Sequence, residues 1–199
     1  MTGNSRVTTT FGQIKNYNMK KIVLIHGLIA GFIVSTIMAI SMITYYNNQE
    51  LMLGTGSMII GYLSMLISFS LIFVAIKTYR DKENDGLISF GKAFKIGMLI
   101  ALIACTMYVI VWAIVYNFFV PDFMEKYSDF MIKQASGTSS AAEMQQKVAE
   151  MNEYKAMYKN PISFALITYA EILPVGILVT LISALILMRR NRKEVVLAV

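Results

Sequence analysis

Residues 22–45 of this chain read IVLIHGLIAGFIVSTIMAISMITY, a run that contains no Lys, Arg, Asp or Glu. Three further apolar runs occupy residues 57–76, 96–120 and 162–188, and Glu171 is the only charged residue in them. A helix needs about 20 apolar residues to cross the roughly 30 Å hydrocarbon core of a bilayer. The four runs, in a chain of mean hydropathy +0.58, therefore predict an all-α integral membrane protein built as a four-helix bundle.

Lys and Arg residues are distributed unevenly among the segments that flank the four runs. Thirteen of the 18 lie before the first run, between the second and third runs, or after the fourth run. Cytoplasmic segments of membrane proteins carry such an excess, so we expect four crossings of the cell inner membrane with both termini in the cytoplasm. The net charge of +6 then reflects topology. No basic stripe is interleaved with aromatic residues, so no nucleic acid partner is expected.

The beginning of the chain allows more than one interpretation. Residues 1–18 are polar, rich in Thr and aperiodic, so we expect a disordered extension, with Met19 as a second candidate start. Met19, Lys20 and Lys21 before an apolar run also resemble a secretory signal peptide, but the run exceeds the about 7–15 apolar residues of such a peptide. We therefore predict an uncleaved first crossing, one membrane domain over residues 19–193, and a cytoplasmic tail at 194–199.

The segment 121–161 between the third and fourth runs shows helical periodicity. Phe123 and Tyr127 fall on one face of a first helix. Ser140, followed three residues later by Glu143, forms a capping box that opens a second helix. We expect an extracytoplasmic helical hairpin between helices 3 and 4, packed on their projecting ends. Disorder of this segment is the alternative, and its apolar periodicity argues against it.

Small residues recur every four positions in all four runs. Such stripes allow helix backbones to approach closely inside a membrane. Packing within one chain is their plainest use, and a homodimer through Gly27 and Gly31 is the alternative. The stripes are Gly27, Gly31, Ser35 and Ala39; Ser57 and Gly61; Gly97, Ala101 and Cys105; and Gly176, Thr180 and Ala184.

Glu171 is the first intramembrane polar candidate. An ionisable group inside an apolar helix is costly and by default suggests a function such as proton or cation handling. Pro174 follows three residues later and leaves the carbonyl of Ala170 without its helical donor. However, about 18 helical residues separate Glu171 from Arg189, or about 27 Å. This places the carboxylate near the outer boundary, where a structural role in contact with water or the hairpin is the alternative.

His26 is the second intramembrane polar candidate, and we interpret it as a hydrogen-bonding or headgroup-facing residue. The chain has one His and one Cys, Cys105 in the third run, and shows no catalytic motif, so no catalytic, cofactor-binding or metal-binding residues are expected. The hairpin segment contains several Met residues, and thioethers bind Cu(I). Their spacing of seven within each helix instead indicates a packing seam. We therefore predict a protein that is not an enzyme and needs no cofactor.

Four sequence blocks occur together in the order and spacing of one known family. They are FGKAFKIG (90–97), VPDFMEKY (120–127), YKNP (158–161) and EILPVGILVTLISALIL (171–187). Over roughly residues 19–193 the chain resembles an uncharacterised bacterial multi-pass membrane family catalogued as domain of unknown function 4199. The resemblance implies a small bacterial inner-membrane protein, and it brings no activity, ligand or site residues.

Two functions follow as expectations. The first is a non-enzymatic membrane protein that binds another membrane or periplasmic protein, or senses envelope conditions, through its hairpin. The alternative is a small transporter, or an accessory subunit of one, that uses Glu171 beside the Pro174 kink. In both cases the lipid bilayer is the main partner.

Overall fold

The structure is a computed structural model that describes residues 5–137 and 140–189. Regular structure in these ranges is helical, and their one β contact is an isolated bridge between Ile88 and Arg189. The prediction of an all-α protein is therefore confirmed. The elements are α1 (Ser5–Tyr45), α2 (Gln49–Leu53), α3 (Thr55–Thr78), the π-helical turn η1 (Tyr79–Glu83), α4 (Phe90–Phe118), α5 (Phe123–Ser136), α6 (Ala141–Lys159) and α7 (Pro161–Leu187).

Four stretches of the described chain are long and apolar enough to cross a membrane. Their outward faces carry many large apolar side chains, for example Phe32, which is 66% exposed, and Ile67, which is 62% exposed. Monomeric soluble proteins rarely expose large contiguous apolar patches, whereas lipid solvates them. These features define a membrane protein. The stretches are Met19–Tyr45 in α1, Thr55–Glu83 in α3 and η1, Phe90–Phe118 in α4, and Pro161–Leu187 in α7.

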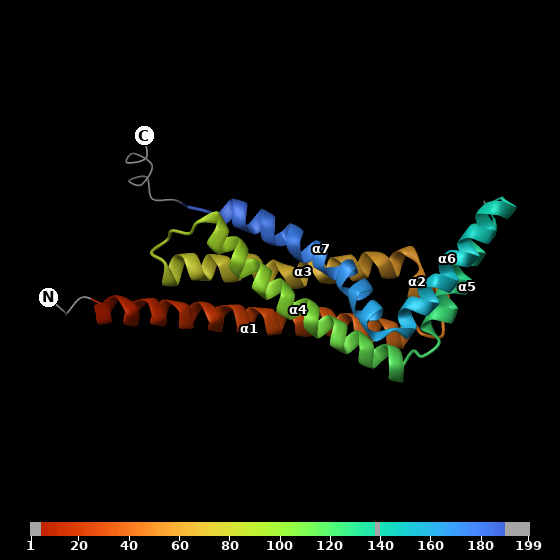
Figure 1. Cartoon of the computed structure of the whole chain (residues 1–199). Coiled ribbons are helices and arrows are strands. Elements are labelled where there is room, and N and C mark those ends of the chain that lie inside the picture. Colours follow the sequence, from red (N-terminus) through yellow and green to blue (C-terminus); the bar gives the residue numbers. More distant parts are fainter. Residues whose placement is uncertain (1–4, 138–139, 190–199) are drawn as a thin grey trace.

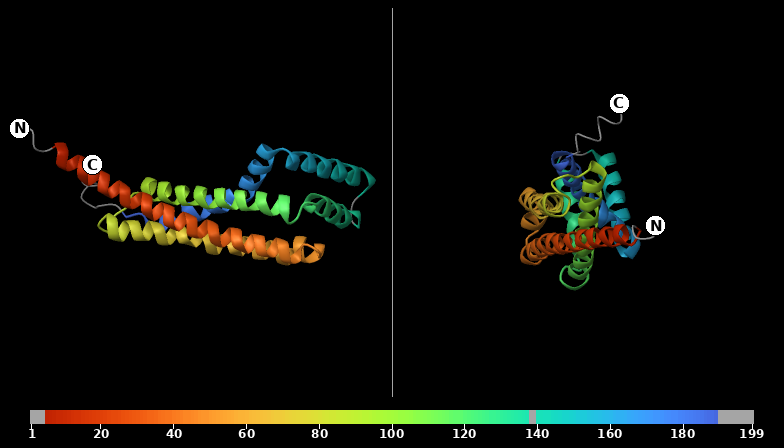
Figure 2. Two further views of the ribbon diagram at one scale, coloured as in Figure 1. Left: turned by 90° about the horizontal axis from the view of Figure 1, so that it is seen from below. Right: turned by 90° about the vertical axis from the view of Figure 1, so that its left-hand side faces the viewer.

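The four long helices form an elongated bundle. Helix α1 packs against α3 and α4, and α7 packs against the same two helices from the other side. The start of α1 and the end of α7 lie at one end of this bundle, and α5 and α6 lie at the other end (Figures 1 and 2). An even number of long helices returns the chain to the end from which it started, so this placement agrees with four helices that alternate in direction.

Glycines bring α4 close to both of its main neighbours. A Cβ atom added at Gly31 of α1 would lie 3.1 Å from the Cα atom of Ala104 in α4. A Cβ atom at Gly97 of α4 would lie 2.6 Å from Cγ2 of Thr180 in α7. The small-residue stripes of helices α1, α4 and α7 therefore pack within the chain, where close backbone approach maximises dispersion contacts.

The alternative of a homodimer through Gly27 and Gly31 meets a steric obstacle in this arrangement. A Cβ atom at Gly27 would lie 2.9 Å from Cβ of Ile103, and one at Gly31 would lie 2.7 Å from Sδ of Met107. Helix α4 of the same chain thus covers both glycines. A second copy could reach them only after α4 had moved away, so the homodimer stays a prediction that this packing does not support.

The beginning of α1 differs from the predicted disordered extension at residues 1–18. Helix α1 starts at Ser5 and runs without a break to Tyr45, and its first part extends beyond the rest of the bundle (Figure 2). Adding a residue to an existing helix costs much less than nucleating a new helix. The apolar span therefore acts as a nucleus from which the helix continues upstream. Residues 1–4 and the predicted tail at 194–199 lie outside the described residues.

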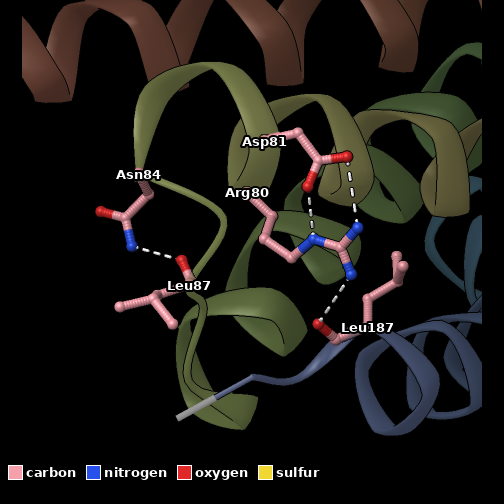
Figure 3. A network of polar contacts seen from close by, with 5 residues as sticks. All are labelled: Arg80, Asp81, Asn84, Leu87 and Leu187. Carbon is pink, nitrogen blue, oxygen red and sulfur yellow. Dashed lines mark hydrogen bonds and ion pairs between the residues drawn. The ribbon is translucent and has the colours of Figure 1, made fainter. Parts of the chain in front are cut away.

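A network of polar contacts ties the α3–α4 connection to the end of α7 (Figure 3). Nε of Arg80 donates to Oδ1 of Asp81 over 2.6 Å, and Nη1 of Arg80 donates to the carbonyl oxygen of Leu187 over 3.4 Å. The Asn84 amide donates to the carbonyl oxygen of Leu87. Arg80 thus satisfies one of the carbonyl groups that the C-terminus of α7 leaves without an intrahelical donor.

A tight turn and a backbone bridge complete this end of the bundle. Asp85 and Gly86 have φ angles of 53° and 77°, in the left-handed region that Gly adopts at no steric cost and Asp tolerates. The N–H of Ile88 then donates to the carbonyl of Arg189 over 3.0 Å, and the N–H of Arg189 donates back over 2.8 Å. The connection between α3 and α4 is therefore held directly against the chain that leaves α7.

Candidate functional site

Helices α5 and α6 form a hairpin between the third and fourth long helices. Its second helix is opened by the predicted capping box: Oε2 of Glu143 accepts a hydrogen bond from the N–H of Ser140 over 2.7 Å, and the Ser140 hydroxyl accepts one from the N–H of Glu143 over 3.4 Å. These contacts stabilise the ionised carboxylate, with the backbone hydrogen bond as the largest cause, and so lower the pKa of Glu143. The capping box is confirmed.

Six aromatic residues, which we call the aromatic cluster, hold the base of the hairpin on α4 and α7. The ring of Trp112 meets that of Phe123 edge to face, with centroids 5.0 Å apart. The ring of Tyr116 lies 5.5 Å from that of Tyr158 and 5.3 Å from that of Phe164. The members are Trp112 and Tyr116 of α4, Phe123 and Tyr127 of α5, Tyr158 of α6 and Phe164 of α7.

The hairpin covers the projecting ends of α4 and α7 only in part. Val120 is fully buried and Phe164 is buried within the aromatic cluster. Phe118 is 78% exposed and Ile162 is 72% exposed. The hairpin therefore packs on one side of each projecting helix end, as expected. The other side of each end is exposed.

A lysine fastens the start of α5 to the end of α1. Nζ of Lys126 lies 3.4 Å from the centroid of the Tyr46 ring and donates to the Tyr46 carbonyl over 3.1 Å. The same ammonium group lies 3.5 Å from Oδ2 of Asp122. A cation over an aromatic face is attracted by the ring quadrupole, so this contact adds a second attachment of the hairpin to the bundle.

The outer part of the hairpin is largely uncovered. Met151 is the only described residue of α6 that is buried. Val148, Tyr154 and Met157 of the same helix are exposed. Met124 of α5 is also buried, which agrees with the interpretation of these methionines as packing residues. Within the described residues no three His, Cys, Asp or Glu side chains are grouped as a metal site would require.

Glu171 opens onto a cavity of about 200 Å³ in the half of the bundle next to α5. The residue remains accessible, because the cavity is open on one side. Helices α1 and α3 supply most of the cavity wall, while Tyr108 of α4, Tyr127 of α5 and Glu171 of α7 close the remaining sides. With Leu53 of α2, residues of six helices line the cavity beside this one carboxyl group.

Two tyrosines outside the membrane-length helices, Tyr158 and Tyr127, have pKa values that are raised above the ordinary value. Burial raises the pKa of Tyr158, and the negative charge of Glu171 adds to that shift against a hydrogen bond from Trp112. Burial also raises the pKa of Tyr127, with smaller contributions from charged neighbours that include Glu171. Both hydroxyl groups therefore stay neutral over the physiological pH range.

Glu171 lacks a described cationic partner. The lining residues of the cavity include no Lys, Arg or His, and none of the ion pairs among described residues involves Glu171. Pro174, one turn further along α7, lies within the helix. Its missing N–H leaves the carbonyl of Ala170 without the usual helical hydrogen bond.

His26 lies apart from this cavity, in α1. Its Nδ1 atom is 2.8 Å from the carbonyl oxygen of Ile22 in the preceding turn, and it is not among the residues that line the Glu171 cavity. The structure therefore does not bring the two intramembrane polar candidates together. A histidine that donates to its own helix backbone needs no ligand to satisfy that ring nitrogen.

Sequence reasoning identified Glu171 but missed the cavity around it. A Cβ atom added at Gly61 of α3 would meet no atom within 4 Å, and Gly61 and Ser57 line the cavity. The small residues Ser57 and Gly61 therefore leave a cavity open beside α3. The small residues of α4 and α7 instead let these two helices pack closely together. Spacing alone could not separate these two uses, because they depend on which helix lies opposite.

Taken together, the fold and the cavity define a helical membrane protein with a carboxyl group beside a partly open cavity and a helical hairpin at one end. The chain belongs to the family described as protein of unknown function (DUF4199), which matches residues 25–189. This confirms the resemblance seen in the sequence. No curated protein and no solved structure matches the chain significantly.

Proposed function

We propose that this is a non-enzymatic, multi-pass protein of a bacterial inner membrane that docks a partner protein, or senses envelope conditions, through the α5–α6 hairpin. In this proposal both termini are cytoplasmic and the hairpin is extracytoplasmic, as the excess of Lys and Arg on the terminal side favours. One His and one Cys in the whole chain give little material for a catalytic centre.

The observation that carries this proposal is the contrast between the two ends of the hairpin. Its base is fastened by the aromatic cluster and by Lys126. Beyond this base, α6 exposes Val148 and Tyr154. Aromatic and Met side chains are enriched in protein interfaces, and a rigid base reduces the entropy lost when such a surface binds.

Site-specific photo-crosslinking in native membranes tests the docking function. A photoreactive amino acid at Tyr154 should give one discrete adduct, whereas the same amino acid at Lys82, at the terminal end of the bundle, should not give that adduct. The substitution Val148→Asp should reduce the yield at least about tenfold, because burying an unpaired charge opposes association. Asn152→Asp, at an exposed polar position of α6, is the matched control. Absence of a discrete adduct from the exposed α6 positions would overturn the proposal.

A small transporter, or a subunit that assists one, is the second candidate, and the cavity at Glu171 is the observation that favours it. An ionisable residue that faces a cavity inside a helical bundle is typical of ion and substrate pathways. The variant Glu171→Gln in proteoliposomes tests this candidate. Loss of a pH- or ion-dependent flux would support transport, and a change in thermal stability alone would assign Glu171 a structural role.

A further inference from the structure

The cavity at Glu171 is lined by one carboxyl group and by no Lys, Arg or His side chain. The lining includes three Tyr residues, several Met residues and Ser hydroxyls, and Glu171 is its only carboxylate. The Ser64 hydroxyl is already used, because it donates to the carbonyl of Gly61 over 2.7 Å. An occupant that pairs with the ionised form of Glu171 must therefore be cationic.

A metal ion fits this lining poorly. Ca²⁺ takes about 6–8 oxygen ligands, and Mg²⁺ requires near-octahedral coordination. The described residues contain no group of three or more His, Cys, Asp or Glu that could hold a metal ion. A hard cation bound here would keep most of its water in a space whose wall is largely apolar.

An organic ammonium ion fits the same wall better. Its charged head can pair with the Glu171 carboxylate and lie against the rings of Tyr108 and Tyr127, because aromatic faces attract cations. Its apolar part can contact Met38 and Met65, whose flexible thioether side chains adapt to irregular ligands. A cavity of roughly 150 Å³ holds benzene in another protein, so about 200 Å³ suits a slightly larger molecule.

We propose that the cavity lined by α1, α2, α3, α4, α5 and α7 binds a small organic monocation, a primary ammonium with a short apolar tail, with Glu171 as its counter-charge. Binding at this cavity does not depend on docking at the hairpin. The two proposals can therefore fail separately.

Equilibrium dialysis of the full chain in lipid nanodiscs, with isotopically labelled hexylamine as the probe, tests this proposal. After subtraction of empty nanodiscs, saturable binding is expected. Unlabelled hexylammonium should displace the probe at least about tenfold more effectively than hexanol, which has nearly the same shape but no charge. Glu171→Gln should bring the two competitors close to equal, whereas Glu171→Asp, which retains the charge, should keep the preference for the amine.

A pair of glycine variants separates the cavity from general effects on the fold. Gly61 lines the cavity and Gly56 does not, and a Cβ atom at either glycine would meet no atom within 4 Å. Gly61→Leu should abolish saturable binding, and Gly56→Leu should leave it unchanged. The proposal is overturned if wild-type protein shows no saturable binding, if Glu171→Gln keeps the preference for the amine, if Gly61→Leu binds as wild type does, or if Mg²⁺ or Ca²⁺ displaces the probe at stoichiometric amounts.

Discussion

At the scale of single residues, two span glycines differ in what a methyl group added to them would meet. A Cβ atom at Gly97 would lie 2.6 Å from Cγ2 of Thr180, a fully buried side chain, whereas one at Gly61 would meet no atom within 4 Å. We expect Gly97→Ala to lower the free energy of unfolding by about 1–3 kcal/mol through overpacking. Gly61→Ala, in contrast, should be neutral or stabilising by up to roughly 1 kcal/mol, because Ala favours a helix more than Gly.

Thermal unfolding in one detergent, followed by circular dichroism, measures this pair. The melting temperature of Gly97→Ala should fall below that of wild type, and that of Gly61→Ala should not. Equal effects of the two substitutions would contradict the assigned α4–α7 contact, since both replace a glycine inside a membrane-length helix.

Tyr158 gives a residue-scale prediction for alkaline pH. Its pKa in the folded protein is raised by burial and by the charge of Glu171, while an unfolded tyrosine has a pKa of about 10. The folded state therefore holds the proton more tightly. Its contribution to stability is complete below pH of about 10 and is lost as pH rises through the folded pKa. Tyr158→Phe should make denaturant unfolding less sensitive to pH in this range, and Tyr154→Phe, at an exposed position, is the control.

At the scale of elements, the hairpin depends on the aromatic cluster at its base. Phe123 is buried against Trp112, and Phe118, only five positions earlier, is largely exposed. Phe123→Ala should weaken the packing free energy that attaches α5 to α4 by roughly 3–5 kcal/mol. Amide hydrogen exchange in α5 and α6 should become faster, while exchange in the spans changes little. Phe118→Ala should leave the hairpin unchanged, and equal acceleration by both variants would show that the cluster does not hold the base.

Local sequence signals predicted the elements well, and the limits of these signals are physical. The Ser140–Glu143 capping box is confirmed because both partners belong to one helical turn. The beginning of α1 differs from the predicted disorder, because a polar segment with no apolar face can still be drawn into helix by the span that follows it.

At the scale of the whole molecule, the proposed docking function depends on the orientation of the chain in the membrane. Glu153 of α6 and Lys82 of η1, which follows α3, are exposed, and the native Cys105 is buried. Helix α6 lies at one end of the molecule and the end of α3 lies at the other (Figure 1). In intact cells a membrane-impermeant maleimide should label Glu153→Cys and should not label Lys82→Cys. Labelling of Lys82→Cys alone would invert the orientation, and labelling of both positions would rule out four crossings. Disrupted cells provide the control that both thiols can react.

The sequence by itself determined that four helices of this chain are of membrane length, where the second hairpin helix begins, and that Glu171 is an unusual residue within its apolar run. These are properties of individual segments, because the transfer of a helix into lipid depends on its own length and composition. Only the tertiary structure decided that the α4 and α7 stripes pack together while Gly61 leaves space, and that Glu171 meets Tyr108 and Tyr127 in a cavity. Such contacts depend on which helix lies opposite which, and in lipid that choice follows from shape complementarity between surfaces, which no single segment contains.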